Sequence, residues 1–219
     1  MSVRIFNSKT QKVEEFKPIE EGKVSMYVCG PTVYNHAHIG NARPIVVFDL
    51  LKRVLETEGY DVHYVSNYTD VDDKIIAKAL EKNTPESEVA QKYIDAYKAI
   101  RKELNADDLD ATPQVTNNMD RIIAFIEKLI EEDKAYEKNG NVYFRVSQIS
   151  DYGSISNQDL DALLVGARIE RNQEKENPLD FVLWKKTTEG IAWDSPWSKG
   201  RPGWHTECVV MIHHEFGKH

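Results

Sequence analysis

A short segment of histidine, glycine and asparagine, residues 36–41, has the residue types that bind phosphate. It reads His-Ala-His-Ile-Gly-Asn and lies between an apolar run and a pattern typical of a helix. Backbone amides at a helix start have no partner within the helix, and the helix dipole attracts anions to the same end. His36, His38, Gly40 and Asn41 are therefore candidates for a phosphate-binding loop. Taken alone, the pattern also fits histidines that cap a helix or lie on the surface.

The two cysteines, Cys29 and Cys208, are the other candidates for chemistry. They lie near opposite ends of the 219-residue sequence. Secreted proteins that are held together by disulfides have dense, short cysteine spacings, so we expect reduced thiols here rather than a disulfide. Cysteine is often buried as a small apolar residue, and composition alone favours two buried, unreactive thiols.

The elements that must position these residues follow from apolar spacing and turn residues. The first half alternates strand and helix patterns, and Val24–Cys29 is predicted to be a buried strand followed by a loop that extends to Gly40. The predicted strands are 3–6, 12–16, 24–29 and 61–67, and the predicted helices are 44–58, 72–82 and 86–104. Because strands and helices alternate, we expect a parallel sheet and an α/β fold.

A different pattern begins near residue 112. A helix, a hairpin that turns at Asn139-Gly140, a polar loop and a second helix are predicted in succession, over 115–133, 136–146, 151–177 and 206–216. The first of these helices is amphipathic. We interpret residues 112–200 as an inserted α+β domain that stands apart from the parallel sheet.

Composition excludes several functional classes. The formal net charge of −8 argues against a protein held to nucleic acid by bulk positive charge, so any RNA contact must be local. No apolar run approaches the roughly 20 residues that cross a bilayer, and the start of the chain lacks the apolar core of a signal peptide. We therefore expect a cytoplasmic, globular protein with no membrane association.

Several longer sequence words point to one family. Residues 26–34 read MYVCGPTVY and residues 38–43 read HIGNAR, and further words occupy 67–74, 136–144, 180–185 and 200–208. Together these words closely resemble the cysteinyl-tRNA synthetases, which are class I aminoacyl-tRNA synthetases. The resemblance runs the length of the chain and is specific to that family, not only to a fold.

The resemblance implies a Rossmann-like parallel sheet with an inserted α+β connective domain. Residues 1–111 would form the first half of the nucleotide-binding catalytic domain, 112–200 the connective domain, and 201–219 the start of the second half. The sequence stops before the family's KMSKS loop and anticodon-binding domain. We therefore expect an amino-terminal portion of such an enzyme, which alone would be inactive or very weak.

The resemblance also assigns roles to single residues. His38, Ile39 and Gly40 match the first three residues of the HIGH signature, and Asn41 stands in place of its second histidine. His38 and Asn41 would act in catalysis, and they would bind ATP together with His36 and Gly40. A second group would bind the substrate cysteine: Gly30, Thr69, Trp204 and His205.

Cys29 and Cys208 resemble two of the family's four zinc ligands. The other two, a histidine and a glutamate, belong to a downstream His-His-Glu-Asn segment that this sequence does not contain. His213-His214-Glu215 imitates that segment, but it falls within a predicted helix and fits an exposed helix face. His205 is the better local substitute, because it lies three positions before Cys208 and the two would share a helical face. Zinc would distinguish cysteine from serine, because it binds a soft thiolate far better than a hydroxyl.

Three acidic residues, Asp70, Asp72 and Asp73, are open to two interpretations. By resemblance they would lie near the substrate ammonium group or a magnesium ion. Alternatively they would cap helices, since carboxylates accept hydrogen bonds from the unpaired amides at a helix start. The sequence favours capping.

The resemblance implies that L-cysteine is activated by ATP and Mg²⁺ to cysteinyl-adenylate and then transferred to tRNA(Cys) by a monomeric enzyme. His38, at a predicted helix start, is suited to stabilise the charge that develops on the α-phosphate. Two alternatives stay open. A related ATP-dependent cysteine:amine ligase shares the first step and the zinc pocket. A non-catalytic fragment would carry out neither step.

Overall fold

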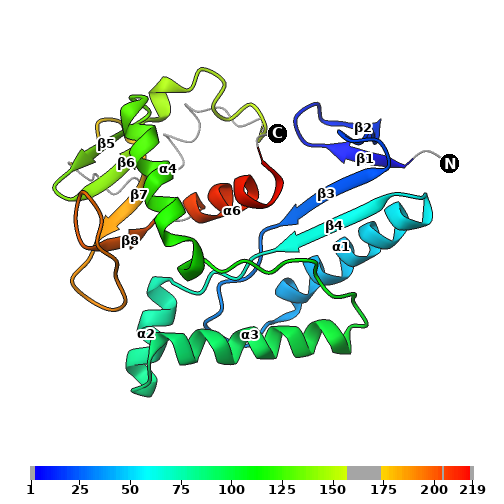
Figure 1. Ribbon diagram of the computed structural model, residues 1–219, viewed down its shortest axis with the longest axis horizontal. Coiled ribbons are helices and arrows are strands. Elements are labelled where there is room, and N and C mark those ends of the chain that lie inside the picture. Colours follow the sequence, from blue (N-terminus) through cyan, green and yellow to red (C-terminus); the bar gives the residue numbers. More distant parts are fainter. Residues whose placement is uncertain (1–2, 157–173, 204, 218–219) are drawn as a thin grey trace. The chain divides into compact units, whose positions relative to one another are not determined.

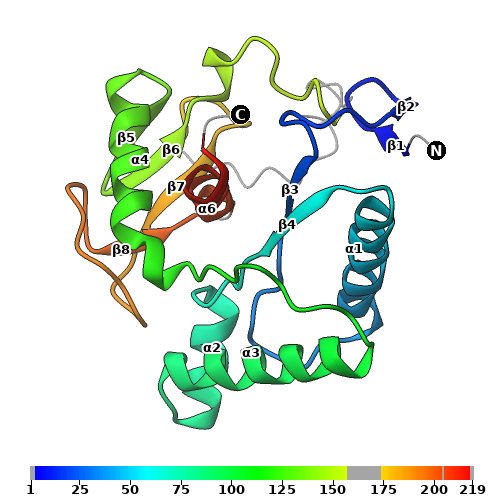
Figure 2. The ribbon, with the colours of Figure 1, turned by 45° about the vertical axis from the view of Figure 1, so that its right-hand side comes forward.

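The computed structural model describes residues 3–156, 174–203 and 205–217. Within this range the chain divides into two compact units. The first contains Lys17–Met119 and the chain from Cys208 onward, and the second contains Arg4–Phe16 and the described part of Asp120–Glu207. Each unit has its own sheet (Figures 1 and 2). Among the helices of the described residues, none is long and apolar enough to cross a membrane.

A parallel pair of strands forms the centre of the first unit. β3 (Lys23–Val28) runs parallel to β4 (Asp61–Ser66), in a regular register that ends where Val28 pairs with Ser66. Helix α1 (Ile39–Thr57) connects the two strands as the crossover that parallel pairing requires (Figure 1). The predicted parallel sheet and α/β class are confirmed.

The two strands differ in burial because, among the described residues, β4 alone has neighbouring chain on both of its edges. An extended segment that includes Ala111 and Gln114 makes parallel bridges to Val65 and Tyr68. Consequently β4 is buried along most of its length, whereas β3 buries alternate residues. The expectation of a buried strand at 24–29 therefore holds for one face of β3 only.

Helices α2 (Asp73–Lys82) and α3 (Glu86–Glu103) pack against each other and against the loop that follows β3. Asp72 caps α2 by accepting a hydrogen bond from the amide of Lys74 (2.9 Å), and Asn83 ends the helix in a left-handed conformation. The apolar core that these elements share contains Val33, Ile45, Tyr68, Ile75, Ala79, Val89, Ala90, Tyr93, Ile94 and Tyr97. Both helices match their predicted ranges closely.

Helix α1 begins at Ile39 and not at Pro44, where the sequence pattern predicted its start. The side chain of His38 accepts a hydrogen bond from the amide of Gly40, and the side chain of Asn41 accepts one from the amide of His38. This capping box satisfies amides that the helix leaves unpaired, so the helix forms ahead of the proline. Gly40 and Asn41 thus lie in the first helical turn, not in the preceding loop.

The second unit contains an antiparallel sheet and a separate hairpin. The hairpin pairs β1 (Arg4–Asn7) with β2 (Lys12–Glu15). The sheet has the order β5 (Ala135–Lys138), β6 (Asn141–Phe144), β7 (Phe181–Lys186) and β8 (Gly200–Pro202). The predicted hairpin that turns at Asn139-Gly140 is confirmed as β5–β6. The predicted polar loop over 151–177 lies mostly outside the described residues.

The remaining elements are short helical turns and two helices near the division between the units. The turns are η1 (Thr116–Asn118) and η2 (Val146–Gln148), and the helices are α4 (Met119–Glu131) and α6 (Thr206–Phe216). The division between the units falls within α4 and α6, because it lies at 119/120 and 207/208. Helix α6 has the predicted limits, and the predicted helix over 115–133 is formed by η1 and α4.

Asp180 organises the second unit from a buried position. Its side chain is 1% exposed and accepts hydrogen bonds from the Tyr136 hydroxyl (2.8 Å) and from the amides of Val146 (2.9 Å) and Asn177 (3.0 Å). A buried carboxylate needs several such donors to offset the loss of water. The sequence word at 180–185 therefore has a structural function, which is to anchor the start of β7.

A cluster of charged side chains fastens α1 to the segment after α3. The carboxylate of Asp49 accepts hydrogen bonds from the amide of Asp107 (2.7 Å) and from Arg53 Nε (2.8 Å). Burial alone would raise the pKa of Asp49, but these hydrogen bonds and the charges of Arg53 and Arg101 outweigh burial and hold the pKa below its ordinary value. The ionised carboxylate therefore stabilises the fold.

We expect Asp49→Asn to lower the free energy of unfolding at pH 7 by about 1–3 kcal/mol, because a charged acceptor of two hydrogen bonds is lost. The folded pKa of Asp49 lies below the unfolded value. The stabilising contribution is therefore present above the unfolded pKa and is lost as the pH falls through the folded pKa. Urea unfolding at a series of pH values measures both the loss and its decline in acid.

The matched control is Glu56→Gln in the same helix. It removes a half-exposed partner of Lys52 and should change the free energy of unfolding by less than about 0.5 kcal/mol. A difference between wild type and Asp49→Asn that stays constant from pH 7 to pH 3 would show that the charge of Asp49 is not the stabilising factor.

Candidate functional site

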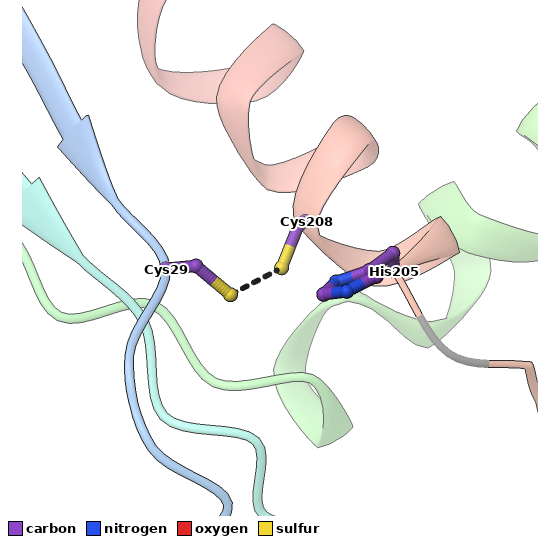
Figure 3. Close-up of side chains that lie close together, drawn as sticks. All are labelled: Cys29, His205 and Cys208. Carbon is purple, nitrogen blue, oxygen red and sulfur yellow. Dashed lines mark hydrogen bonds between the residues drawn. The ribbon is translucent and has the colours of Figure 1, made fainter. Parts of the chain in front are cut away.

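Cys29 and Cys208 lie side by side despite their separation in the sequence. Cys29 follows the last residue of β3, and Cys208 lies in the first turn of α6 (Figure 3). Their Sγ atoms are 3.4 Å apart, and no disulfide joins them. Cys208 is buried and Cys29 is exposed, so the pair can be reached from the side of Cys29. The prediction that these two residues come together is confirmed.

His205 brings a nitrogen atom to the same place. A ring nitrogen of His205 and the two sulfur atoms all lie within 4.8 Å of one another (Figure 3). The predicted shared helical face is wrong, because His205 precedes α6 and has a left-handed backbone with φ 68°. Desolvation by the surrounding atoms lowers the pKa of His205, which favours the neutral imidazole that coordinates metals.

The chemistry and spacing of these three groups fit a zinc ion. Zinc binds thiolate sulfur at about 2.3 Å in a tetrahedral arrangement, which sets two sulfur ligands roughly 3.8 Å apart. The Sγ atoms of Cys29 and Cys208 are 3.4 Å apart, so a small movement would reach that spacing. Two thiols and one imidazole within the described chain supply three ligands. Three protein ligands with one open position are the pattern of catalytic zinc sites.

Gly30 and Thr69 lie just beyond the carboxyl ends of β3 and β4, and Gly30 directly follows Cys29 in the chain. The amide of Gly30 donates to Asn67 Oδ1 (2.9 Å), and Asn67 Nδ2 donates to Thr69 Oγ1 (3.2 Å). A Cβ atom on Gly30 would lie 1.6 Å from the carbonyl oxygen of Asn67, so only glycine permits this approach. Two predicted pocket residues and Cys29 therefore share one sheet edge. Of the other two predicted pocket residues, His205 lies with the cysteine pair and Trp204 lies outside the described residues.

The N-cap geometry of His38 fixes which ring nitrogen carries a proton. Nδ1 accepts the amide of Gly40 (3.0 Å), so the neutral ring has its proton on Nε2. Nε2 is then a hydrogen-bond donor. Asn41, the departure from the HIGH signature, completes the cap through Oδ1, which accepts the amide of His38 (3.2 Å). Gly40 lacks the Cβ that would lie 2.7 Å from the His38 ring.

A cavity of about 310 Å³ lies at the start of α1. His36, His38 and Asn41 line it, together with Lys74 and Tyr93. The His36 ring meets the Tyr93 ring edge-on, with centroids 5.2 Å apart. Three of the four predicted ATP-binding residues thus share one cavity. The cysteine pair, Gly30 and Thr69 do not line it, so the site has two parts that are joined by the loop after β3.

Sequence reasoning missed Asn67, Lys74 and Tyr93. Asn67 and Lys74 are the first and last residues of the family motif at 67–74. The motif marked this segment as important but did not show where either side chain points. Tyr93 had no signal, because a tyrosine at helical spacing in α3 looks like any core residue.

The three acidic residues have different structural roles. Asp72 caps α2, and Asp70 accepts hydrogen bonds from the amide (3.1 Å) and the hydroxyl of Thr116. Burial raises the pKa of Asp70, although the bonds from Thr116 oppose the shift. Asp73 lies in the first turn of α2, where a negative charge is favourable. Capping, which the sequence favoured, is confirmed for Asp72, whereas Asp70 instead fastens the segment at Thr116 through a tertiary contact.

Comparison with known proteins gives concordant matches in sequence. A family model described as tRNA synthetases class I (C) catalytic domain matches residues 15–219. A protein named cysteine–tRNA ligase from Halalkalibacterium halodurans is 54% identical over 97% of this chain and 46% of its own length. One of the same name from Anoxybacillus flavithermus is 53% identical over 99% of this chain and 47% of its own length. The chain thus spans about half the length of the curated relatives it matches.

A solved structure supports the fold independently of sequence. Mycobacterium tuberculosis methionyl-tRNA synthetase in complex with methionyl-adenylate matches with a TM-score of 0.64. The match covers 89% of this chain and 47% of that chain at 12% identity. At so low an identity the likeness concerns the fold alone, and it agrees with the Rossmann-like class I architecture that the sequence predicted.

The cap at the start of α1 gives a stability test that separates the two roles of His38. We expect His38→Ala to lower the free energy of unfolding by about 1 kcal/mol, because the amide of Gly40 loses its acceptor. His38→Asn should change it by less than about 0.5 kcal/mol, because asparagine is a preferred N-cap residue. Urea unfolding measures both. An equal loss in the two variants would show that the imidazole stabilises the chain by something other than capping.

Proposed function

Because this chain belongs to the catalytic-domain family of the class I (C) tRNA synthetases, we propose that the protein joins L-cysteine to tRNA(Cys) at the expense of ATP. The observation that carries the proposal is the cysteine pair. Cys29 and Cys208 are far apart in sequence, yet their sulfur atoms are 3.4 Å apart beside Gly30 and Thr69. A thiol-binding metal site at the edge of an amino-acid pocket suits an enzyme that must choose cysteine.

Selection of cysteine is assigned to Cys29, Cys208 and His205, which would hold a zinc ion. When bound, the ion supplies a soft Lewis acid that prefers a sulfur ligand to an oxygen ligand. Without such a centre, cysteine and serine differ by one atom, and apolar contacts discriminate weakly between groups so similar. Exposed Cys29 leaves an approach for the substrate, whereas buried Cys208 fixes the inner side of the site.

The rest of cysteine would be held at the carboxyl ends of β3 and β4. Gly30 offers an unobstructed backbone there, and Thr69 offers a hydroxyl whose position Asn67 determines. Open parallel sheets bind ligands at this edge. Trp204 is proposed as the closing wall of the pocket, on the sequence resemblance alone.

Activation of cysteine would take place at the start of α1. A carboxylate oxygen of cysteine attacks the α-phosphorus of ATP, and the bond from that phosphorus to the bridging oxygen breaks to release pyrophosphate. His38 Nε2–H and the amides of the first helical turn would donate to the charge that develops on the phosphate, while His36 and Asn41 line the cavity. Magnesium would accompany ATP. A terminal hydroxyl of the tRNA then attacks the acyl carbon, and AMP leaves.

We further propose that the protein is a cytoplasmic monomer. The cytoplasm keeps thiols reduced, and the described chain has two close cysteines without a disulfide. The formal charge of −8 predicts that tRNA is held by local contacts.

Zinc content tests the metal site directly. We expect the wild-type chain to bind one zinc ion and Cys208→Ala to bind it at least about 100-fold more weakly, since loss of a ligand should cost no less than loss of an outer-shell partner. Competition with a chromophoric chelator measures the affinity. His213→Ala, which removes an exposed histidine of α6, should leave the affinity unchanged. Equal zinc binding by wild type and Cys208→Ala would remove Cys208 from the site.

Activity of the full-length protein tests the reaction. We expect cysteine-dependent exchange of pyrophosphate into ATP, followed by charging of tRNA(Cys). His38→Asn should slow the exchange by about 10²–10³-fold, because one aimed donor is lost while the helix cap is kept. Exchange without charging would favour the ATP-dependent cysteine:amine ligase. Absence of exchange with cysteine in the wild-type protein would refute the proposed function.

A further inference from the structure

We propose that Asn67 is a positioning residue that sets the geometry between the amino-acid pocket and the Cys29–Cys208 pair. Its side chain is 0% exposed, and it follows directly after β4. Asn67 was not among the candidate site residues of the sequence. The inference rests on the proposed function in one respect, which is that the two cysteines and the pocket serve the same reaction.

Both polar atoms of the Asn67 side chain are engaged with the site. Oδ1 accepts the amide of Gly30 (2.9 Å), and Nδ2 donates to Thr69 Oγ1 (3.2 Å). The sulfur of Cys208 lies 4.0 Å from the same Oδ1. The buried side-chain amide of Asn67 therefore contacts the backbone of Gly30 after β3, the side chain of Thr69 after β4, and Cys208 in α6.

The sheet pairing shows why a side chain is needed here. Regular pairing of β3 with β4 ends at Val28↔Ser66, and the next bridge joins Thr32 to Thr69. Three residues, 29–31, lie between these bridges on one side and two residues, 67–68, on the other. We call this irregular stretch with one extra residue the bulge, and such an interruption leaves backbone groups without their ladder partners. The interrupted ladder leaves the amide of Gly30 without a backbone partner, and the side chain of Asn67 accepts a hydrogen bond from it.

Asparagine is the side chain that meets both demands of this buried position. The amide of Gly30 needs an acceptor, and Thr69 Oγ1 receives a donor. Aspartate would keep the acceptor but lose the donor, and alanine would lose both. Alanine would leave the Gly30 amide unsatisfied, and aspartate would place a charge at a fully buried position, so either substitution should let the bulge relax. Cys29 is part of that bulge, so relaxation would move its sulfur relative to Cys208.

The first test measures the distance between the two thiols without any metal. Dibromobimane alkylates one thiol and fluoresces strongly only after it bridges to a second thiol nearby. In the metal-free chain, exposed Cys29 reacts first. The rate of the second, bridging alkylation then depends on the distance between the Cys29 and Cys208 sulfur atoms. We expect Asn67→Ala to slow the bridging step about tenfold relative to the first alkylation, by analogy with the roughly 10–100-fold loss of metal affinity or activity that follows removal of an outer-shell partner. Asn67→Asp should slow it less, because it keeps the acceptor for Gly30.

Asn118→Ala is the matched control. Asn118 is also buried, but its Nδ2 donates locally, to the carbonyl oxygen of Gln114 four residues earlier (2.8 Å). The Asn118→Ala variant should lose stability to urea as Asn67→Ala does, but it should keep the wild-type bridging rate. Bridging by Asn67→Ala at the wild-type rate, or equal slowing in Asn118→Ala, would overturn the positioning role.

The second test uses Co²⁺ as a spectroscopic substitute for zinc. Thiolate-to-cobalt absorption should appear in the wild-type chain and in Asn118→Ala, and Asn67→Ala should need about 10–100-fold more metal for the same signal. Equal titration curves for wild type and Asn67→Ala would count against the inference. If the wild-type chain bridges with dibromobimane but gives no cobalt signal, the metal role fails while the bridging comparison still decides the role of Asn67.

Discussion

The end of the parallel pairing between β3 and β4 is the constraint on which the site depends. Two parallel strands bring their carboxyl ends to the same sheet edge, and beyond that edge the two chains must diverge without leaving buried amides unpaired. Here they diverge through one extra residue on the β3 side, with Cys29 and Gly30 in the bulge. The side chain of Asn67 replaces the missing backbone partner. The residues proposed for metal binding and those proposed for substrate binding thereby share one local irregularity.

Much of the fold could be predicted because local signals and tertiary packing agree. The apolar spacing in α2, α3 and α6 and the turn at Asn139-Gly140 led to elements that the structure contains within a residue or two. The start of α1 was missed because proline is common in the first helical turn, whereas the actual cap is made by histidine and asparagine. His205 was placed on a helix because spacing alone cannot reveal a left-handed residue before the first turn.

The candidate site could be predicted only in part. The proximity of Cys29 and Cys208 was predicted from sequence motifs of the family, because no physical rule brings together two cysteines at opposite ends of a chain. Asn67 escaped because its importance lies in three contacts with residues from other segments. A polar residue directly after a strand reads as a loop residue until the structure shows that it is fully buried. Buried polar hubs of this kind are visible in coordinates but not in hydrophobic patterns.

The close approach at Gly30 has a genetic consequence. Every single-nucleotide change that replaces glycine adds at least a β-carbon, and at this position that atom would lie 1.6 Å from a backbone oxygen. Backbone atoms cannot swing aside as a flexible side chain can, so even alanine, the smallest replacement, must displace one of the two strand ends. We therefore expect selection to remove missense substitutions at Gly30. A lineage that lost glycine there would have to rebuild the bulge before it could recover the site.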